Sequence, residues 1–152
     1  GTTITFWHSM GGVNGQAIDM LVKKFNDENE YGITVEAQYQ GEYDDSLNKL
    51  KSAQIGNMGA DLVQVYEIGT RFMIDSGWIV PMQEMIDADG YDVSEIEPNL
   101  AAYYTIDNEL YSMPFNSSTP ILYYNKDMFD KDKVLSAYSE EIGGFEAHLQ
   151  KI

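Results

Sequence analysis

The sequence predicts an α/β domain with a mainly parallel, open sheet and helices on both faces. A short apolar strand, residues 3–7, comes first. Then Ile18, Leu21, Val22 and Phe25 follow the i, i+3, i+4, i+7 spacing of an amphipathic helix. Strand-like and helix-like patterns alternate twice more along the chain. Alternation of this kind favours a parallel sheet whose connecting helices cover its two faces.

The second and third strand–helix pairs follow in order. Residues 33–39 alternate between apolar and polar side chains, which predicts a strand that Gly41 ends. Helical spacing returns at Tyr43 and continues to about Gly56. Residues 61–66 then predict a third strand, and a helix that opens at Gly69-Thr70 is expected to close at Gly77.

The remaining segments are less regular. Pro81 to Gly90 predicts a short helix and a turn, and Ser94 to Tyr104 predicts another helix. The sequence then offers two extended segments, which a straight crossing should join because the residue before Pro120 is pushed towards extended geometry. These segments are residues 110–115 and 119–124. The expected divisions are an N-terminal lobe over 1–110, hinge-crossing strands over 111–127, and an atypical C-terminal segment over 128–152.

Composition excludes several classes of function. The chain has 152 residues, no cysteine, and 25 acidic against 9 basic residues, giving a formal net charge of −16. Because the chain has no cysteine, disulfides and thiolate chemistry are excluded. Without a basic patch, nucleic acid is not an expected partner. The negative field would hinder an anionic ligand at long range, so local hydrogen-bond donors would have to overcome it.

Candidate binding residues come from the rule that ligands of open parallel sheets bind at the carboxyl ends of the strands. The first strand ends at Trp7-His8-Ser9, the second is followed by Tyr43, and the third ends beside Glu67. Aromatic rings with a few convergent polar groups suit a polyol or sugar.

Each of these residues also has a structural interpretation. Trp7 could belong to the core, His8 could be a satisfied structural histidine, and Tyr43 could be the first apolar position of its helix. Glu67 could be an acid that the helix dipole stabilises. No metal site or cofactor is expected, since no second histidine lies near His8 and no catalytic motif is present.

Three motifs give the sequence a family resemblance. They are Phe-Trp-His-Ser-Met at 6–10, Gln-Val-Tyr-Glu-Ile-Gly-Thr at 64–70, and Pro-Phe-Asn-Ser-Ser-Thr-Pro at 114–120, continuing to residue 127. Together they resemble the extracellular solute-binding proteins of ABC importers, family 1, and most narrowly the members that bind glycerol phosphate. The resemblance covers about the first 127 residues.

The resemblance implies two α/β lobes of the periplasmic-binding-protein type, which a hinge joins and which close on a solute. Tyr43, Glu67 and Ser118 match positions that contact glycerol phosphate from the N-terminal lobe. Trp7, His8, Ser9 and Ser117 line the same region. The resemblance further implies no catalysis, partnership with ABC transporter membrane subunits, and an extracytoplasmic location, periplasmic or lipid-anchored, with the signal removed.

The implied solute is glycerol 3-phosphate, a glycerophosphodiester or a sugar. We expect this chain to carry only one of the two lobes and therefore to bind weakly. Two alternatives stay open. One is an interaction module, such as a homodimer or swapped dimer through the exposed inter-lobe face. The other is a fragment of a glycoside hydrolase, which would need two cooperating acids in one cleft.

Overall fold

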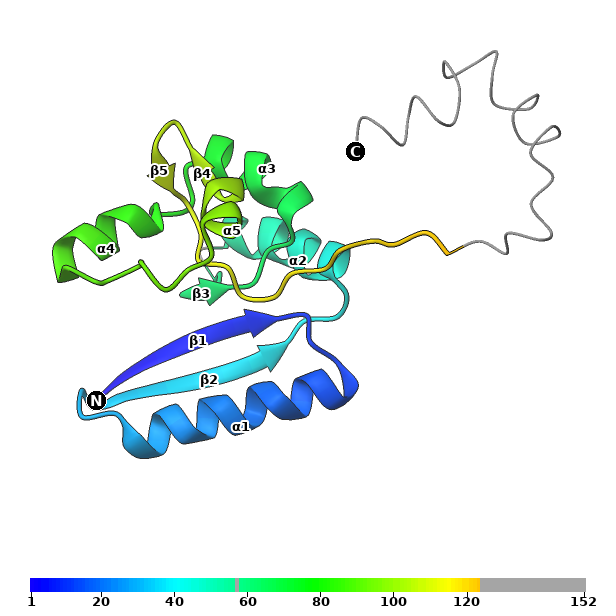
Figure 1. The fold of residues 1–152 in the computed structure, drawn as a ribbon. Helices are drawn as coiled ribbons and strands as arrows, with labels where there is room; N and C mark the ends of the chain where they lie inside the picture. The colour runs from blue at the N-terminus through cyan, green and yellow to red at the C-terminus, as the bar shows by residue number, and fades with distance from the viewer. Residues whose placement is uncertain (57, 124–152) are drawn as a thin grey trace, which may run out of the picture. The chain divides into compact units, whose positions relative to one another are not determined.

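The computed structural model describes residues 1–56 and 58–123, and the regular structure lies in a first unit, Gly1–Asn116 (Figure 1). A second unit begins at Ser117. The first unit contains, in chain order, β1 (Thr2–His8), α1 (Gly12–Glu28), β2 (Ile33–Tyr39), α2 (Tyr43–Ile55), β3 (Leu62–Val63), a 3-10 turn η1 (Glu67–Gly69), α3 (Thr70–Ser76), α4 (Met82–Asp89), α5 (Pro98–Tyr103), β4 (Thr105–Ile106) and β5 (Glu109–Leu110).

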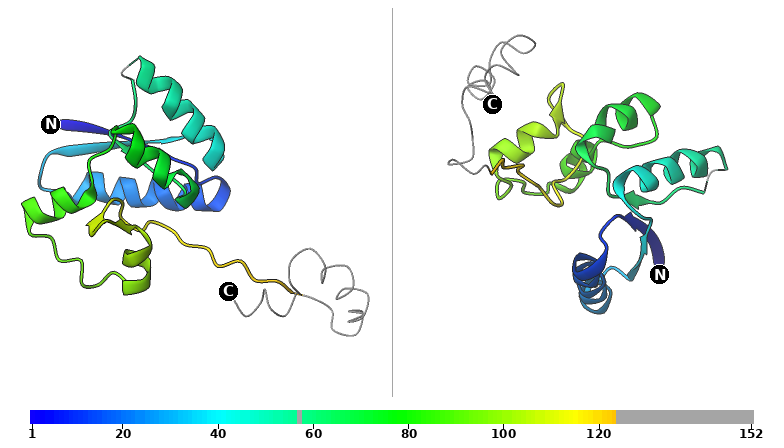
Figure 2. Two further views of the ribbon diagram at one scale, coloured as in Figure 1. Left: turned by 90° about the horizontal axis from the view of Figure 1, so that it is seen from above. Right: turned by 90° about the vertical axis from the view of Figure 1, so that its right-hand side faces the viewer.

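The main sheet has the strand order β2-β1-β3 and is parallel throughout. Phe6 of β1 pairs with Ala37 on one side and Leu62 on the other, so the three strands run in register. Helix α1 lies against one side of the sheet and α2 against the other (Figures 1 and 2). The α/β class with helices on both faces is therefore confirmed.

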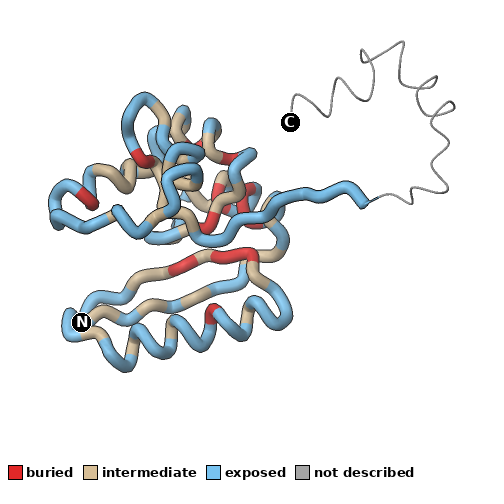
Figure 3. Tube along the Cα trace, viewed as in Figure 1, coloured by how far each residue is buried: buried red, intermediate tan, exposed pale blue. Residues whose placement is uncertain are grey.

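The core of the first unit lies between α2, α3 and one face of the sheet. Leu47, Leu50 and Met73 form its buried centre, and Leu50 is only 2% exposed. Half-buried side chains from β1, β3 and the segment after it pack around this centre, Trp7 and Tyr66 among them. Buried positions accordingly gather along α2, α3 and the second half of β1 (Figure 3). This packing fixes α2 against the strand ends.

The stripe of α1 that faces the sheet differs from the expected one. Ile18 is buried and Val22 is half-buried, as the periodicity predicts, but Leu21 is 61% and Phe25 41% exposed. Two turns of helix after Ile18, the sheet-facing position passes from apolar residues to Asn26, whose neighbours are backbone groups of β2. Leu21 and Phe25, two members of the predicted apolar stripe, therefore lie outside the buried core.

Two asparagines attach the end of α1 to the outer side of β2. The Asn26 amide donates to the Val35 carbonyl (2.9 Å) and its oxygen accepts from the Val35 N–H (2.8 Å). Asn29 makes the same pair of bonds with Ile33, at 2.9 and 3.1 Å.

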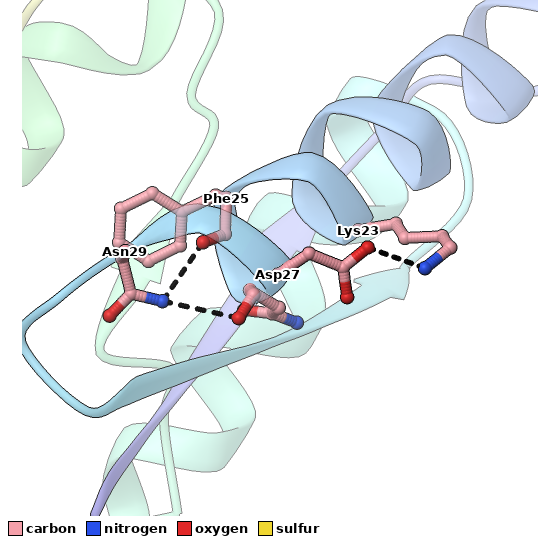
Figure 4. A network of polar contacts seen from close by, with 5 residues as sticks. Lys23, Phe25, Asp27 and Asn29 are labelled. Carbon is pink, nitrogen blue, oxygen red and sulfur yellow. Dashed lines mark hydrogen bonds and ion pairs between the residues drawn. The ribbon is translucent and has the colours of Figure 1, made fainter.

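Asn29 also ends the helix, because its amide donates to the Phe25 carbonyl beside the Lys23–Asp27 ion pair (Figure 4). The helix therefore stops at Glu28.

Later elements are shorter than predicted. Strand β3 is confined to Leu62–Val63, with Gln64 adding one bond to the Trp7 carbonyl, because β1 ends at His8 and leaves the following residues without a partner. Helix α5 starts at Pro98 instead of Ser94, since proline suits the first helical position and the Glu97 side chain accepts from the Leu100 N–H.

The hinge crossing expected over 111–127 stays a prediction, although the described residues 111–123 form no regular strand. The last strand of the described residues is Glu109–Leu110, which forms an antiparallel hairpin with Thr105–Ile106. Residues 111–123 form no β-bridge with another strand. The hairpin turn is Asp107-Asn108, with φ values of 53° and 68°, which these two residue types tolerate. Residues 124–127 and the tail 128–152 lie outside the described residues.

Other helix ends follow the sequence closely. Gly77 ends α3 with φ of 67°, a left-handed conformation that a side chain would disfavour.

Among the helices of residues 1–56 and 58–123, none combines the length and the apolar character that a membrane span requires. The same residues contain no cluster of three or more His, Asp or Glu side chains suited to a metal ion.

Candidate functional site

The parallel register brings the three strand ends to one end of the sheet. His8 pairs with Tyr39, and Trp7 pairs with Val63, so the chain leaves all three strands at the same level. Tyr43 opens α2 shortly after β2, and Glu67 opens η1 shortly after β3. Tyr43 is half-buried and Glu67 is exposed. The two side chains expected to meet a solute thus share one rim and remain accessible.

Helix α2 begins at Tyr43 because of a reciprocal cap. The Glu42 side chain accepts from the Asp45 N–H, and the Asp45 carboxylate accepts from the Glu42 N–H (3.3 Å). This capping box satisfies two donors at the helix start. The first turn also carries Asp44, whose negative charge interacts favourably with the positive end of the helix dipole. The start of α2, and with it the place of Tyr43, is fixed locally.

Tyr43 is stacked on a second tyrosine. Its ring lies 5.6 Å from that of Tyr66, with an angle of 13° between the planes. The Tyr66 hydroxyl donates to the Asp44 carboxylate. That hydrogen bond, with burial and the charges of Asp44 and Glu67, raises the pKa of Tyr66. Tyr66 therefore stays protonated and holds its ring in place as a platform for Tyr43.

Glu67 is placed by the tight turn that leads into α3. Gly69 is buried within this turn, and a Cβ there would lie 2.6 Å from the Val65 side chain, so only glycine fits without a shift. The negative charge of Glu67 acts on the pKa of two tyrosines, Tyr66 and Tyr104. Burial first, and then the negative charge of Glu67, raises the pKa of Tyr104. Glu67 is therefore an exposed hydrogen-bond acceptor beside aromatic surface.

A connected set of polar side chains links β1 to the candidate rim. The Ser9 N–H donates to Gln64 Oε1 (2.9 Å), and Gln64 Nε2 donates to Asn116 Oδ1 (2.7 Å). Asn116 Nδ2 then donates to the Tyr43 hydroxyl (3.2 Å). Gln64 is 8% exposed, whereas Asn116 is exposed. This set gives the Tyr43 hydroxyl a fixed neighbour in the absence of any ligand.

The other predicted contacts from β1 have structural partners. Trp7 packs against the Leu47–Leu50–Met73 centre, and its indole N–H donates to Gln38 (3.1 Å).

His8 is 3% exposed, and its Nδ1 accepts from the Met10 N–H (3.2 Å). Burial lowers the pKa of His8 although Asp19 acts in the opposite direction, so the ring is neutral near pH 7. The structural alternatives for Trp7 and His8 thus have direct support, and their contact with a solute stays a prediction.

The serines differ in their surroundings. Ser9 is 6% exposed, and its Oγ has no hydrogen-bond partner among the described residues. Ser117 and Ser118 are exposed and belong to the second unit. Their roles toward a solute, like that of Ser9, stay predictions.

The sequence interpretation missed Gln64, Asn116 and Asp44 as parts of the rim. One signal could have found Gln64, because it is a polar residue inside the apolar run Leu62 to Val65, and a buried polar side chain requires a partner. Asn116 lies in the motif that supplied Ser117 and Ser118. No spacing rule connects it to Tyr43, which is distant in sequence.

Two hollows of the described surface lie away from this rim. One, of about 360 Å³, is lined by residues of α1 and the following loop, including Leu21, Phe25 and Tyr31. Another lies beside Gln40 and Lys49 on the polar side of α2. Neither contains Tyr43 or Glu67. We place the candidate site at the rim because the converging polar groups lie there, and a rim needs a second surface to become a closed pocket.

Comparison with known proteins gives one family. Residues 20–150 match the family described as bacterial extracellular solute-binding protein. The sn-glycerol-3-phosphate-binding periplasmic protein of Salmonella paratyphi A is 44% identical over 136 residues, which are 86% of this chain and 30% of that protein. Its Escherichia coli K12 counterpart is 43% identical over the same length. The chain thus spans about 30% of the length of the curated relatives it matches.

Solved structures show the same fold. The structure of UgpB from Mycobacterium tuberculosis with glycerophosphocholine has a TM-score of 0.69 and 24% identity, covering 76% of this chain and 30% of that one. The sugar-binding protein MalE from Xanthomonas citri has a TM-score of 0.62 and 23% identity, covering 74% and 28%. At these identities the likeness establishes the fold of the described unit.

Proposed function

Because this chain belongs to the bacterial extracellular solute-binding protein family, we propose that it is one lobe of an ABC importer's substrate-binding component. The proposed solute is glycerol 3-phosphate or a glycerophosphodiester, with a neutral sugar as the wider class. ABC transporter membrane subunits would receive the solute, outside the cytoplasm. The names of the relatives support this proposal, since they are glycerol-3-phosphate-binding periplasmic proteins at 43–44% identity.

The observation that carries the proposal is the shared rim of Tyr43 and Glu67. Glu67 is a carboxylate that accepts hydrogen bonds from hydroxyl groups, and Tyr43 offers both a ring and a hydroxyl. A polyol presents hydroxyls to the first and CH faces to the second. Ser118, and less directly Ser117, Ser9, Trp7 and His8, would add contacts around the same solute.

Affinity of this lobe alone should be low. A rim open to water leaves about half of a solute unburied, and binding then gains little beyond the cost of immobilising it. We expect a dissociation constant of about 1–20 mM, about −4.1 to −2.3 kcal/mol, for glycerol 3-phosphate. Calorimetric binding tighter than about 10 μM by the 152-residue chain would contradict the one-lobe argument.

Nuclear magnetic resonance titration of this chain tests the site. With glycerol 3-phosphate at constant ionic strength, dose-dependent shifts should gather at Tyr43, Glu67 and their chain neighbours. Glu67→Gln should weaken the response at least about threefold, because a neutral amide oxygen is a weaker hydrogen-bond acceptor than a carboxylate. Glu84→Gln, on the exposed first turn of α4, is the matched control and should leave it unchanged. Shifts that are absent, or that gather away from Tyr43 and Glu67, would refute the proposal.

A second candidate is an interaction module with no ligand of its own. The exposed apolar residues of α1 and its loop favour it, since Leu21, Phe25 and Tyr31 together line a hollow while being 61%, 41% and 83% exposed. Apolar surface gathered in this way marks contact sites. Light scattering over a range of concentrations tests a homodimer: Leu21→Ser should lower its association, and a strict monomer would exclude it.

A further inference from the structure

The hydrogen bonds from Ser9 through Gln64 and Asn116 to Tyr43 have a fixed direction. A backbone N–H can only donate, so Gln64 must present its carbonyl oxygen to Ser9 and its NH₂ group to Asn116. Asn116 must then present Oδ1 to Gln64, which leaves its Nδ2 for Tyr43. We call Gln64 and Asn116 the amide relay.

The relay determines what the Tyr43 hydroxyl can offer. Its oxygen accepts from Asn116 Nδ2, so its hydrogen is directed to a different acceptor. The ring cannot turn away easily, because it is stacked on Tyr66, which Asp44 holds in turn. Tyr43 therefore presents a donor to the rim, whereas the Glu67 carboxylate presents an acceptor.

We propose that Gln64 and Asn116 are positioning residues that orient Tyr43 as a hydrogen-bond donor to the solute, an inference that rests on the proposed function. The pairing of a donor at Tyr43 with an acceptor at Glu67 selects a solute with two kinds of oxygen. One is a hydroxyl that donates to Glu67. The other is an oxygen without a hydrogen, such as a phosphate ester oxygen, that accepts from Tyr43.

A readout without ligand tests the relay in the 152-residue chain. A nuclear Overhauser contact should join the Asn116 Nδ2 hydrogens to the Tyr43 ring hydrogens beside the hydroxyl, since the two heavy atoms lie 3.2 Å apart. Gln64→Ala should remove this contact by freeing the Asn116 amide, and Asn48→Ala, on the exposed face of α2, should retain it. A missing contact in the unsubstituted chain overturns the relay, whatever the chain binds.

A double-mutant cycle tests its effect on binding by titration with glycerol 3-phosphate. Asn116→Leu removes the amide oxygen and the NH₂ group without adding charge. We expect a three- to tenfold weaker affinity, about the worth of one oriented hydrogen bond. In the Tyr43→Phe background, which has no hydroxyl to orient, the same substitution should change affinity less than about twofold. Asn48→Leu should have no effect in either background.

The outcomes separate the two proposals. Equal losses from Asn116→Leu in both backgrounds would show that Asn116 does not act through Tyr43, and would overturn the inference while the proposed function stands. No response of the unsubstituted chain to glycerol 3-phosphate would refute the proposed function and the role of the relay toward a solute. The Overhauser contact would then still decide whether the relay itself exists.

Discussion

Truncation of Leu50 should destabilise the first unit and loosen the helix that carries Tyr43. Leu50 is 2% exposed and lies at the centre of the packing between α2, α3 and the sheet. Leu→Ala substitutions at such sites cost about 2–5 kcal/mol, because apolar contact is lost and a cavity remains. Six half-buried side chains surround this centre, so we expect limited collapse and a loss of about 3 kcal/mol.

The loss expected for Leu50→Ala is a large part of the total free energy of unfolding. At about 0.05–0.15 kcal/mol per residue, a unit of 116 residues has about 6–17 kcal/mol of stability. A loss of about 3 kcal/mol with a urea slope of about 1.5 kcal/mol/M lowers the midpoint by about 2 M. Trp7 packs against the same centre, so its fluorescence reports the transition.

Ile55→Ala is the matched control. Ile55 lies on the same helix but is 92% exposed, and its truncation should change stability by less than about 0.5 kcal/mol. If Leu50→Ala shifted the midpoint no more than Ile55→Ala does, the packing of α2 against the sheet would be refuted.

Two further predictions concern α1 and β1. Asn26→Ala removes both bonds to Val35 and should lower the free energy of unfolding by about 1–2 kcal/mol, despite the better helix propensity of alanine. Asn14→Ala, near the other end of α1, is the control and should be neutral or stabilising in the same denaturation assay. Equal effects of the two substitutions would contradict the attachment of α1 to β2. Because burial lowers the pKa of His8 in the folded state, the unfolded chain binds more protons. The stability that neutral His8 contributes is therefore complete above about pH 6.5 and is lost as the pH falls. From pH 7 to pH 5, the free energy of unfolding should thus fall more steeply for the unsubstituted chain than for His8→Gln. The same slope for both chains would show that His8 is not the group responsible.

Local rules predicted the parallel sheet and most helix ends. Gly56 and Gly77 mark the ends of α2 and α3, and the alternation of strand and helix gave the parallel pairing of β1 with its neighbours. These features depend on residues close in sequence, whose backbone preferences survive in the fold. The carboxyl-end rule also placed Tyr43 and Glu67 at the same rim.

Long-range partners could not be predicted in the same way. The face of α1 depends on which residues meet β2, and there the hydrogen bonds of Asn26 and Asn29 prevailed over the apolar stripe that includes Leu21 and Phe25. Strand lengths depend on the partner as well, so β3 ends near Gln64 because β1 offers nothing further. The amide relay joins residues that no periodicity relates.

The attachment of α1 to β2 has a consequence for how this sheet can grow. An edge strand normally offers a row of vacant amides and carbonyls that another chain can use as a template for aggregation. Here a new strand at β2 would first have to break the four bonds that Asn26 and Asn29 make with Val35 and Ile33. The two asparagine side chains thus occupy the backbone groups at the β2 edge. Any additional strand would join more readily at the opposite edge of the sheet, next to Leu62–Val63.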